Sequence, residues 1–489
     1  MQQPFRLLLL ILVGLPALHG IAALWPPMNH DAAAILHWAQ RMLMGETLYR
    51  DMTDVNPPLI FWISSIPAAF ANLTGLPAGS IYNGFFAILA SASVAGFLIQ
   101  LPPERRLPLG AAAILAAFAL PQHSFGQREH LLFLSCLPYL AAADLRWRGL
   151  PFSTRHAIAV ALPAAIGICV KPHFLLVPIL IEGALLIRRG VRESFRDHTP
   201  FAMISVGVLY IGAAWLFARP YLTEVLPTGL NYYAVGDGLR WSEMLTEREL
   251  LLVAIPLALV SPFLRRAGGL AIAAGLFTLG AGIAGTLQAK GWDYHFLAAR
   301  QGLVLSLAAV ALSFLKDRRA LVIIVVCALT SVSWYMPGRQ QAAFAGTAPG
   351  RIAEFLHHEA HGKTLLWLST SITPQYPALI QAKARSLAWP MSLWLMGEVY
   401  EQDQGNPVPF HAPSAMPPAE HDLWRHTVDE LVRQRPALIV VTDPRLEAGF
   451  DGRDFDWLGW LTQDTEAAAA LKDYRRIEAP DGLIAYRLN

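Results

Sequence analysis

Ionisable residues recur in four separate stretches of this chain, and three of these stretches stand at the ends of long apolar runs. They are the segment that holds Asp31, Glu46, Asp51 and Asp54, and the stretches GQREH (126–130), KPH (171–173) and KGWDYH (290–295). Carboxylates can act as general bases, while Lys, Arg and His can hold an anion such as a phosphate group. One charged group at the end of an apolar run can simply reach out to water, but four such stretches on one membrane face favour a functional site.

Asp31 stands at the start of a helical pattern, and a purely structural role would also account for it. Asp is favoured at helix N-caps, and the preceding Asn29 and His30 are turn formers. Solvation at a surface could explain the other acids of this stretch. Asp51 and Asp54 do not form a clear Asp-x-Asp motif, so no metal or other cofactor is expected, although a divalent metal stays an open alternative.

The composition indicates a membrane protein that crosses the bilayer several times. Hydrophobic residues make up 54% of the 489 residues, charged residues only 15%, and the mean hydropathy is +0.40. A formal charge of +2 gives no reason to expect nucleic acid as a partner. Cys136, Cys169 and Cys327 each lie in an apolar run without metal-ligand spacing, so we expect them to be buried hydrophobic residues.

Long apolar runs predict about eleven membrane spans. They lie at 6–24, 80–100, 108–121, 131–144, 154–170, 172–187, 199–218, 250–264, 268–287, 298–315 and 320–336. With this count, the arginine-rich loops all fall on the side of Arg6, which the positive-inside rule makes the cytoplasmic side. Segment 58–75 contains Pro67 and would break this parity, so it is expected to be a juxtamembrane or re-entrant helix on the outer face.

The composition changes after Met336, where charge and proline content rise and apolar runs shrink to strand length. Residues 1–336 are therefore a transmembrane domain with a first periplasmic loop at 25–57, and residues 337–489 a periplasmic α/β domain. The expected strands lie at 364–370, 437–443 and 483–489, and the expected helices at 419–434 and 464–472.

The first loop, HDAAAILHWAQRMLMGETLYRDMTDVNPPL, resembles the signature of GT-C membrane glycosyltransferases. It looks most like glycosyltransferase family 39, which includes protein O-mannosyltransferases and the aminoarabinose transferases that act on lipid A. In that family an acid opens the loop helix, a Gly-x-x-Tyr-like turn follows, and a Pro-Pro-Leu step leads into the next helix. GQREHLLFL and WDYHFLAA extend the resemblance over the membrane part of about 340 residues.

This resemblance implies a GT-C fold and a hexosyl- or pentosyltransferase. Such an enzyme moves a sugar with inversion from a polyprenyl-phosphate carrier to a glycan, lipid or protein acceptor of the cell envelope. Asp31 matches the family's acid and would be the base that deprotonates the acceptor hydroxyl, while cations would stabilise the departing phosphate. The candidates for the phosphate site are Lys171, His295 and Arg128. The candidates that would contact the acceptor or orient its partners are Glu129, Asp54, Asp51, Tyr294 and Asp293.

One position departs from the family pattern, and two other function classes stay open. Where the lipid A transferases have Lys before Pro-Pro, this chain has Asn56, which argues against aminoarabinose as the sugar. A transporter of lipids or sugars would also bury ionisable residues, but it should show internal repeats and polar residues at mid-membrane. An O-antigen ligase or polymerase would use a diphosphate-linked donor and a large outer loop, for which residues 219–249 are the candidate.

Overall fold

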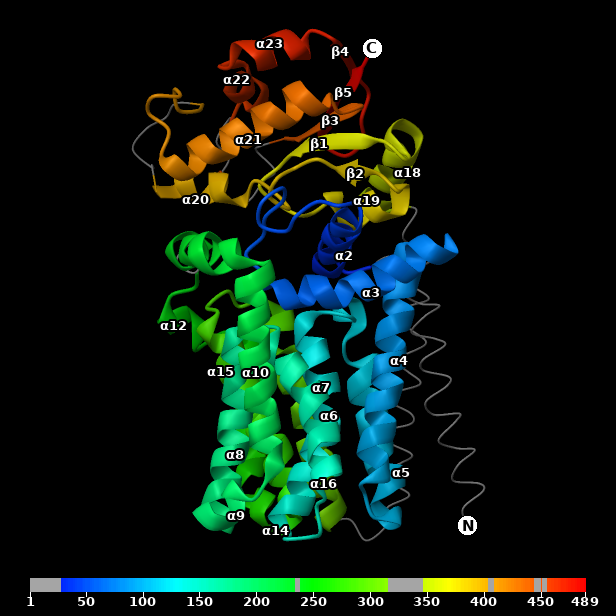
Figure 1. Ribbon diagram of the computed structural model, residues 1–489, viewed down its shortest axis with the longest axis vertical. Helices are drawn as coiled ribbons and strands as arrows, with labels where there is room; N and C mark the ends of the chain where they lie inside the picture. Colours follow the sequence, from blue (N-terminus) through cyan, green and yellow to red (C-terminus); the bar gives the residue numbers. More distant parts are fainter. Residues whose placement is uncertain (1–27, 234–237, 315–345, 403–408, 444–449, 451–454) are drawn as a thin grey trace. The chain divides into compact units, whose positions relative to one another are not determined.

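The computed structural model describes residues 28–233, 238–314, 346–402, 409–443, 450 and 455–489 (Figure 1). These residues form two compact units. One is helical and contains residues 80–217 and 238–314, and the other combines 28–79, 218–233 and the C-terminal residues from 346 onward. The predicted spans 6–24 and 320–336, the predicted boundary at 336/337 and Cys327 lie outside the described residues.

The helical unit consists of long helices with a few helices of four or five residues between them. In chain order they are α4 (Ala78–Ile99), α5 (Pro103–Ile114) with the short helix η1 (Leu115–Ala119), α6 (Arg128–Trp147), α7 (Thr154–Cys169), α8 (Leu176–Arg189), α9 (Val191–Phe195), α10 (His198–Phe217), α12 (Trp241–Met244), α13 (Arg248–Val260), α14 (Leu264–Ala267), α15 (Gly269–Leu287) and α16 (Leu297–Phe314). Every predicted span between residues 80 and 315 overlaps one of these helices. Cys136 is buried and Cys169 half-buried, and both are free thiols.

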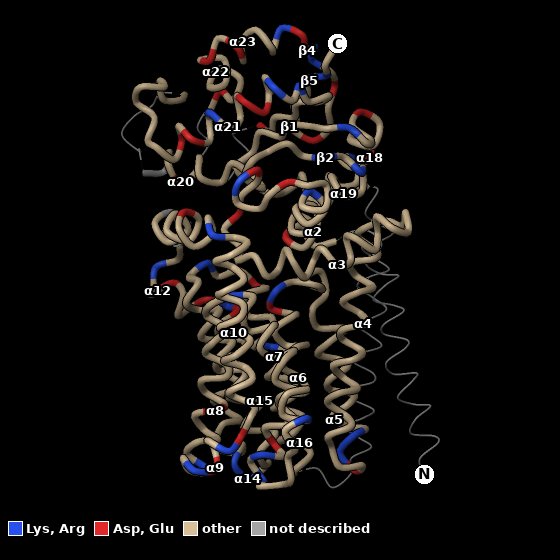
Figure 2. Tube along the Cα trace, in the orientation of Figure 1, with Lys and Arg blue, Asp and Glu red and all other residues tan. Residues whose placement is uncertain are grey.

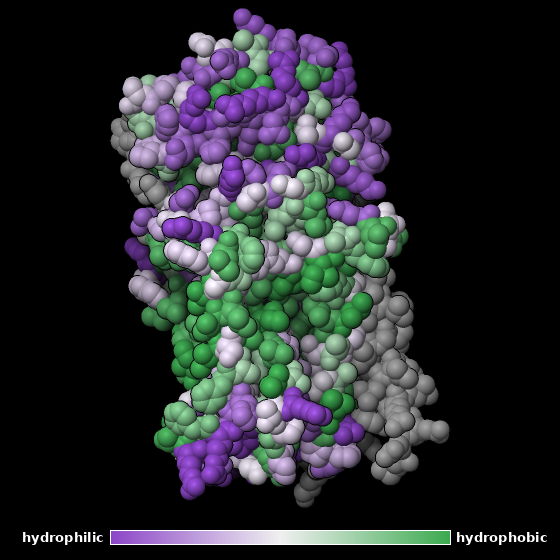
Figure 3. All heavy atoms as spheres, viewed as in Figure 1, coloured by the Kyte–Doolittle hydropathy of each residue, from purple (hydrophilic) through white to green (hydrophobic). Residues whose placement is uncertain are grey.

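Five helical segments of the described chain are long and apolar enough to cross a bilayer. They are Ala78–Ile99, His198–Phe217, Arg248–Ala267, Gly269–Leu287 and Asp293–Phe314. α10 exposes Ile204, Leu209 and Leu216, so its outer surface suits hydrocarbon, and Figure 3 shows hydrophobic residues covering the visible side of the helices. The protein is thus a helical membrane protein, while the total of about eleven spans stays a prediction.

Small residues allow the helices to approach closely. A Cβ on Gly167 of α7 would come within 2.6 Å of the Ser135 Cβ on α6, and a Cβ on Gly280 of α15 would lie 3.0 Å from the Val177 Cα on α8. Lipid supplies no hydrophobic force between helices, so close backbone contact of this kind is a main source of packing energy in a bilayer.

Basic residues gather at one end of the helical unit, where α5 begins and where α9 and α14 lie (Figure 2). A buried ion network stands at the same end. Arg146 binds both carboxylate oxygens of Glu182, at 2.7 and 2.6 Å, and its Nε lies 2.5 Å from Asp197. Arg189 is bound to the same Asp197 oxygen at 2.6 Å. The positive-inside rule predicts that this end faces the cytoplasm, and the orientation stays a prediction.

The second unit contains a mixed sheet flanked by helices. The strands are β1 (Thr364–Leu368), β2 (Arg385–Ser386), β3 (Leu438–Thr442), β4 (Tyr474–Ile477) and β5 (Leu483–Leu488), in the order β2-β1-β3-β5-β4. β1 pairs in parallel with β2 and β3, whereas β5 runs antiparallel to β3 and β4. The surrounding helices are α18 (Ala348–Ala360), α19 (Gln375–Ala382), α20 (Trp394–Gln402), α21 (Pro418–Gln434), α22 (Trp457–Thr462) and α23 (Thr465–Leu471).

Two further helices of this unit come from the first loop and from the segment that follows it. α2 (His30–Leu43) packs against both α3 (Pro58–Thr74) and α19. Segment 58–75 is therefore a helix, as expected. It ends at Gly75, whose φ of 71° suits glycine at a helix end. The unit also contains the short helical pieces η4 (Tyr221–Val225) and α11 (Leu226–Thr228).

Candidate functional site

Four connections of the helical unit meet at the end opposite the arginine-rich one. They are residues 120–127, 170–175, 238–247 and 288–296. Two contacts join three of them: the His123 Nε2 lies 3.6 Å from an Asp293 carboxylate oxygen, and the Leu239 amide donates a 2.6 Å hydrogen bond to the Ala289 carbonyl. Three of the four ionisable stretches seen in the sequence belong to this end of the unit.

Lys171 connects these stretches. Its Nζ donates hydrogen bonds to Glu129 Oε1 at 2.5 Å and to Gln288 Oε1 at 2.9 Å. The ring centroids of Phe174 and Tyr294 lie 5.9 and 5.8 Å from the same nitrogen, which places aromatic faces toward the cation. Lys171 is buried. These contacts hold its ammonium group inside the protein, so it does not reach out to water at the membrane surface.

Other buried basic residues lie at the same end of the helical unit as Lys171. Arg128, Lys290 and His295 are buried, and the charges of Lys171, Arg128 and Lys290 all act on the His295 ring. His173 also lies within electrostatic range of His295. His295 Nδ1 and His173 Nε2 are buried atoms without a hydrogen-bond partner among the described residues. Such a group of donors can bind an anion with several oxygens, such as a phosphate ester.

Glycine and aromatic residues hold His295 in place. It lies in η7 (Asp293–Phe296), and a Cβ on Gly285 of α15 would come within 2.7 Å of the His295 carbonyl oxygen. The Tyr294 ring meets the imidazole edge-on at 4.5 Å between centroids. Asp293, the other predicted residue of this motif, is exposed. The structure thus brings Lys171, His295 and Tyr294 together and leaves Asp293 at the surface.

The acid and the histidine of GQREH have different surroundings. Glu129 is fully buried and holds Lys171 through Oε1, while its Oε2 has no hydrogen-bond partner among the described residues. His130 receives a hydrogen bond from the Gly126 amide at Nδ1, and its Nε2 lies 2.9 Å from the Ala117 carbonyl. Because a carbonyl only accepts, the His130 ring must be neutral with its proton on Nε2. His130 of α6 therefore joins Gly126 of the preceding loop to Ala117 of η1.

Asp31 is not the N-cap of α2. The helix begins at His30, and the side chain of Asn29 accepts hydrogen bonds from the amides of Asp31 (2.9 Å) and Ala32 (3.3 Å). The structural alternative for Asp31 was thus wrong, because Asn29 already provides the cap. Asp31 occupies the first turn, is partly buried, and lies 3.7 Å from the His30 Nε2. A carboxylate there also benefits from the positive end of the helix dipole.

Asp51 and Asp54 organise the loop that follows α2. Asp51 accepts a 2.7 Å hydrogen bond from the Thr47 amide, and Asp54 Oδ1 accepts hydrogen bonds from the amide (2.8 Å) and the side chain (2.5 Å) of Asn56. Burial first, and then the Asp54 charge, raise the pKa of Tyr221 to about 12. The described residues contain no group of three metal-binding side chains. Asp51 and Asp54 thus shape the turn, and any role toward an acceptor stays a prediction.

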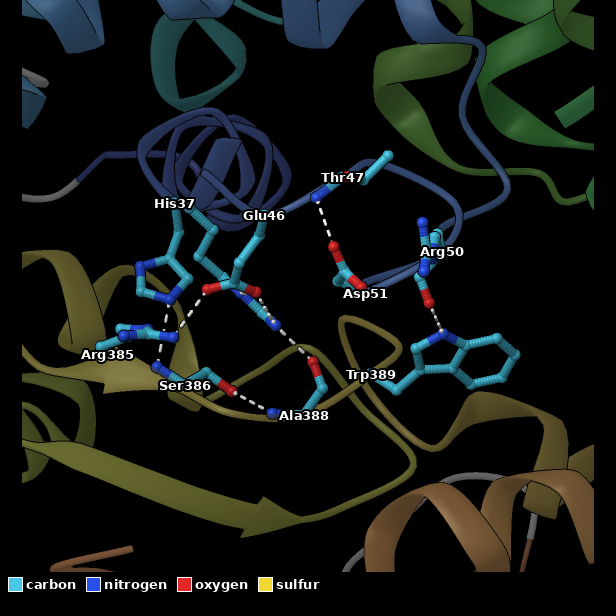
Figure 4. A network of polar contacts seen from close by, with 10 residues as sticks. His37, Glu46, Thr47, Arg50, Asp51, Arg385, Ser386, Ala388 and Trp389 are labelled. Carbon is cyan, nitrogen blue, oxygen red and sulfur yellow. Dashed lines mark hydrogen bonds and ion pairs between the residues drawn. The ribbon is translucent and has the colours of Figure 1, made fainter. Parts of the chain in front are cut away.

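The predicted residues divide between the two units. Asp31, Asp51 and Asp54 belong to the unit with the sheet, while the phosphate candidates and Glu129 belong to the helical unit. A polar network that includes His37, Glu46 and Arg385 joins the first loop to the C-terminal segment (Figure 4). This network was not predicted from the sequence. A partial signal existed, because His37 and Arg41 are four residues apart and therefore share one face of α2.

Comparisons with known proteins add a distant likeness. No protein-family model and no curated protein matches the chain. Among solved structures, a cryo-EM structure of the arabinofuranosyltransferase AftD from Mycobacteria matches with a TM-score of 0.44 and 13% sequence identity. The match covers 99% of this chain and 40% of that one, so the chain spans about two fifths of the length of that protein. A likeness at this level assigns no residue role.

Proposed function

We propose that this protein is an inverting membrane glycosyltransferase of the GT-C type that uses a polyprenyl-phosphate-linked sugar. The observation that carries the proposal is the gathering of the buried cations Lys171, Arg128 and Lys290, together with the imidazole of His295, at one end of an apolar helical unit. Buried cations are expensive to desolvate, so they are kept where an anion uses them. A lipid-linked phosphate supplies such an anion at the membrane surface.

The reaction needs one base and a stabilised leaving group. The base takes the proton of the acceptor hydroxyl, the hydroxyl oxygen forms a bond to the anomeric carbon, and the bond between that carbon and the phosphate oxygen breaks. Polyprenyl phosphate leaves with the bonding electron pair, and the added negative charge falls on groups that Lys171 and Arg128 can contact. Asp31 is the proposed base, on the strength of its place in the first-loop signature and its position in the first turn of α2.

The orientation of the helices supports a site on the outer side of a bacterial inner membrane. The arginine-rich end faces the cytoplasm by the positive-inside rule, and the cationic group lies at the opposite end of the same helices, since Arg128 begins α6 while Arg146 lies in its last turn. The acceptor is then a glycan, lipid or protein of the cell envelope, and the second unit would be periplasmic.

The test is a transfer assay with the full-length protein in lipid nanodiscs and a panel of polyprenyl-phosphate sugars. The product should carry the inverted anomeric configuration. Lys171→Gln alone would strand Glu129 as a buried charge, so the informative variant is Lys171→Gln/Glu129→Gln, which removes both charges and keeps hydrogen-bonding groups. It should bind the donor about tenfold or more weakly, whereas Glu129→Gln alone should not weaken binding, because Glu129 competes with phosphate for Lys171.

One control variant tests the donor site, and two outcomes would identify the alternative functions. Lys363→Gln removes a lysine near the surface of the second unit and should leave donor affinity unchanged. Transfer from diphosphate-linked donors alone would favour a ligase or polymerase. Movement of the lipid-linked sugar across a proteoliposome membrane without transfer would favour a transporter, and either result would contradict the proposal.

A further inference from the structure

The helix that carries Asp31 is attached to the C-terminal segment through polar contacts of its second half. His37 Nε2 accepts a 3.1 Å hydrogen bond from the Ser386 amide, and Arg41 Nη1 donates a 2.7 Å hydrogen bond to the Ala388 carbonyl (Figure 4). Both partners are backbone groups of the segment that contains β2. Backbone groups cannot change rotamer as side chains can. These two bonds therefore fix the rotation of α2 about its axis and its position along that axis.

Glu46 joins the two sides with its two oxygens. Oε2 accepts from Arg41 Nε at 2.8 Å and lies 2.5 Å from Nη2, while Oε1 accepts from Arg385 Nη2 at 2.8 Å. The Arg41 side chain is only 3% exposed and that of Glu46 16% exposed, so solvent screens the first pair little. Glu430 of α21, whose pKa is raised by burial, faces the same group of charges.

The loop beyond Glu46 is attached to the same segment. The Trp389 indole donates a hydrogen bond to the Arg50 carbonyl at 3.2 Å, and the Thr53 amide donates one to the Trp389 carbonyl at 2.6 Å. On the other side, the Tyr376 ring of α19 meets the rings of His37 and Trp38 at 5.7 and 6.4 Å between centroids. The first loop is thus held on both sides of Glu46 by residues more than 320 positions later in the chain.

We infer from this geometry that the C-terminal α/β segment positions the proposed catalytic helix, and that Arg41, Glu46 and Arg385 are positioning residues for sugar transfer. The inference rests on the proposed function. Asp31 and Arg41 are ten residues apart, about 15 Å along one continuous helix. A helix of this length moves as a rigid body, so a rotation at Arg41 also displaces the Asp31 carboxylate. A displacement of about 1 Å at a reacting group can lower the rate substantially.

Arg385→Ala is the informative variant, because the Arg385 side chain is 38% exposed and its loss leaves no buried cavity. Arg487→Ala is the matched control. Its side chain is 37% exposed and binds Glu359 at 2.9 Å, but this pair joins β5 to α18 and does not touch α2. Arg385→Lys keeps the positive charge and should restore part of the lost activity, since a single bond to Glu46 can re-form.

The measurements are kcat, donor affinity, and hydrogen exchange of the α2 amides by mass spectrometry. Arg385→Ala should lower kcat about tenfold, speed exchange across residues 30–43 and leave donor affinity within twofold, while the control changes none of these. An unchanged kcat, or a parallel loss of donor affinity, would overturn the positioning role. A wild-type protein that transfers no sugar from any polyprenyl-phosphate donor would instead overturn the proposed function, whatever the exchange data show.

Discussion

The cap and the proposed base of α2 are different residues, so their roles can be separated by two neighbouring substitutions. Asp31→Asn keeps the size of the side chain and leaves the Asn29 cap intact. It removes only a first-turn carboxylate, whose interaction with the helix dipole is worth about 0.3–1 kcal/mol. The contact with His30 at 3.7 Å adds little, because the His30 side chain is 38% exposed. The free energy of unfolding should therefore fall by less than about 1 kcal/mol, while a base should lose about 10²–10⁴-fold in turnover.

Asn29→Ala should show the reverse pattern. It removes the acceptor of the two capping hydrogen bonds and should cost about 0.5–2 kcal/mol of stability. Turnover per folded molecule should stay within about tenfold, because the carboxylate is still present. Both variants are assayed in nanodiscs by product mass spectrometry and by thermal unfolding followed with tryptophan fluorescence. Near-normal turnover of Asp31→Asn would refute the assignment, and Asp54 or Glu129 would become the next candidate.

Three further predictions concern pH, stability and topology. Burial, then Arg41 and Arg385, lower the pKa of His37 to about 3 from 6.5. Below pH 6.5, His37 therefore binds a proton in the unfolded chain but not in the folded protein. The free energy of unfolding falls toward pH 3 by up to about 1.4 kcal/mol per pH unit. His37→Gln should show a smaller loss of thermal stability between pH 7 and pH 5, and an equal loss would contradict this account. Arg146→Ala strands two acids and should lower the free energy of unfolding by about 3–5 kcal/mol, and a melting temperature like that of the wild type would disprove this. Alkaline phosphatase fused to the C-terminus should be active in cells, and an inactive fusion beside an active cytoplasmic reporter would reverse the orientation.

Hydropathy and periodicity predicted the elements well, because each depends on residues close in the chain. The long helices between residues 80 and 315 and the strands β1, β3 and β5 lie where apolar runs predicted them, whereas the short helices α9, α12 and α14 were not predicted. β2 and β4 were missed. β2 has two residues, and β4 reads YRRI with two exposed arginines, so neither forms an apolar run.

The candidate site was predictable only in part. The phosphate candidates could be found because they recur at the ends of spans, where parity places them on one face. The alternative role of Asp31 as the N-cap of α2 was wrong because Asn29 and Asp31 are both good capping residues. The sequence alone does not rank them. The contacts of His37, Arg41 and Glu46 join residues about 340 positions apart, and no local pattern encodes such a pairing.

The helical unit contains two groups of buried charges, and their difference supports the functional interpretation of one of them. In the arginine-rich end, Arg146 meets both oxygens of Glu182 and one of Asp197, and Asp197 also caps the Thr199 amide. The charged groups of this network are thus bonded to one another, as a stabilising network requires, although the neighbouring hydroxyls of Thr199 and Ser194 are buried without a hydrogen-bond partner among the described residues. In the opposite end, His295 Nδ1, His173 Nε2 and Glu129 Oε2 are buried without hydrogen-bond partners among the described residues. A group of charges that served stability alone would be more stable with a hydrogen-bond partner for each of these atoms. A site that binds and releases a charged substrate instead keeps some donors and acceptors for that substrate.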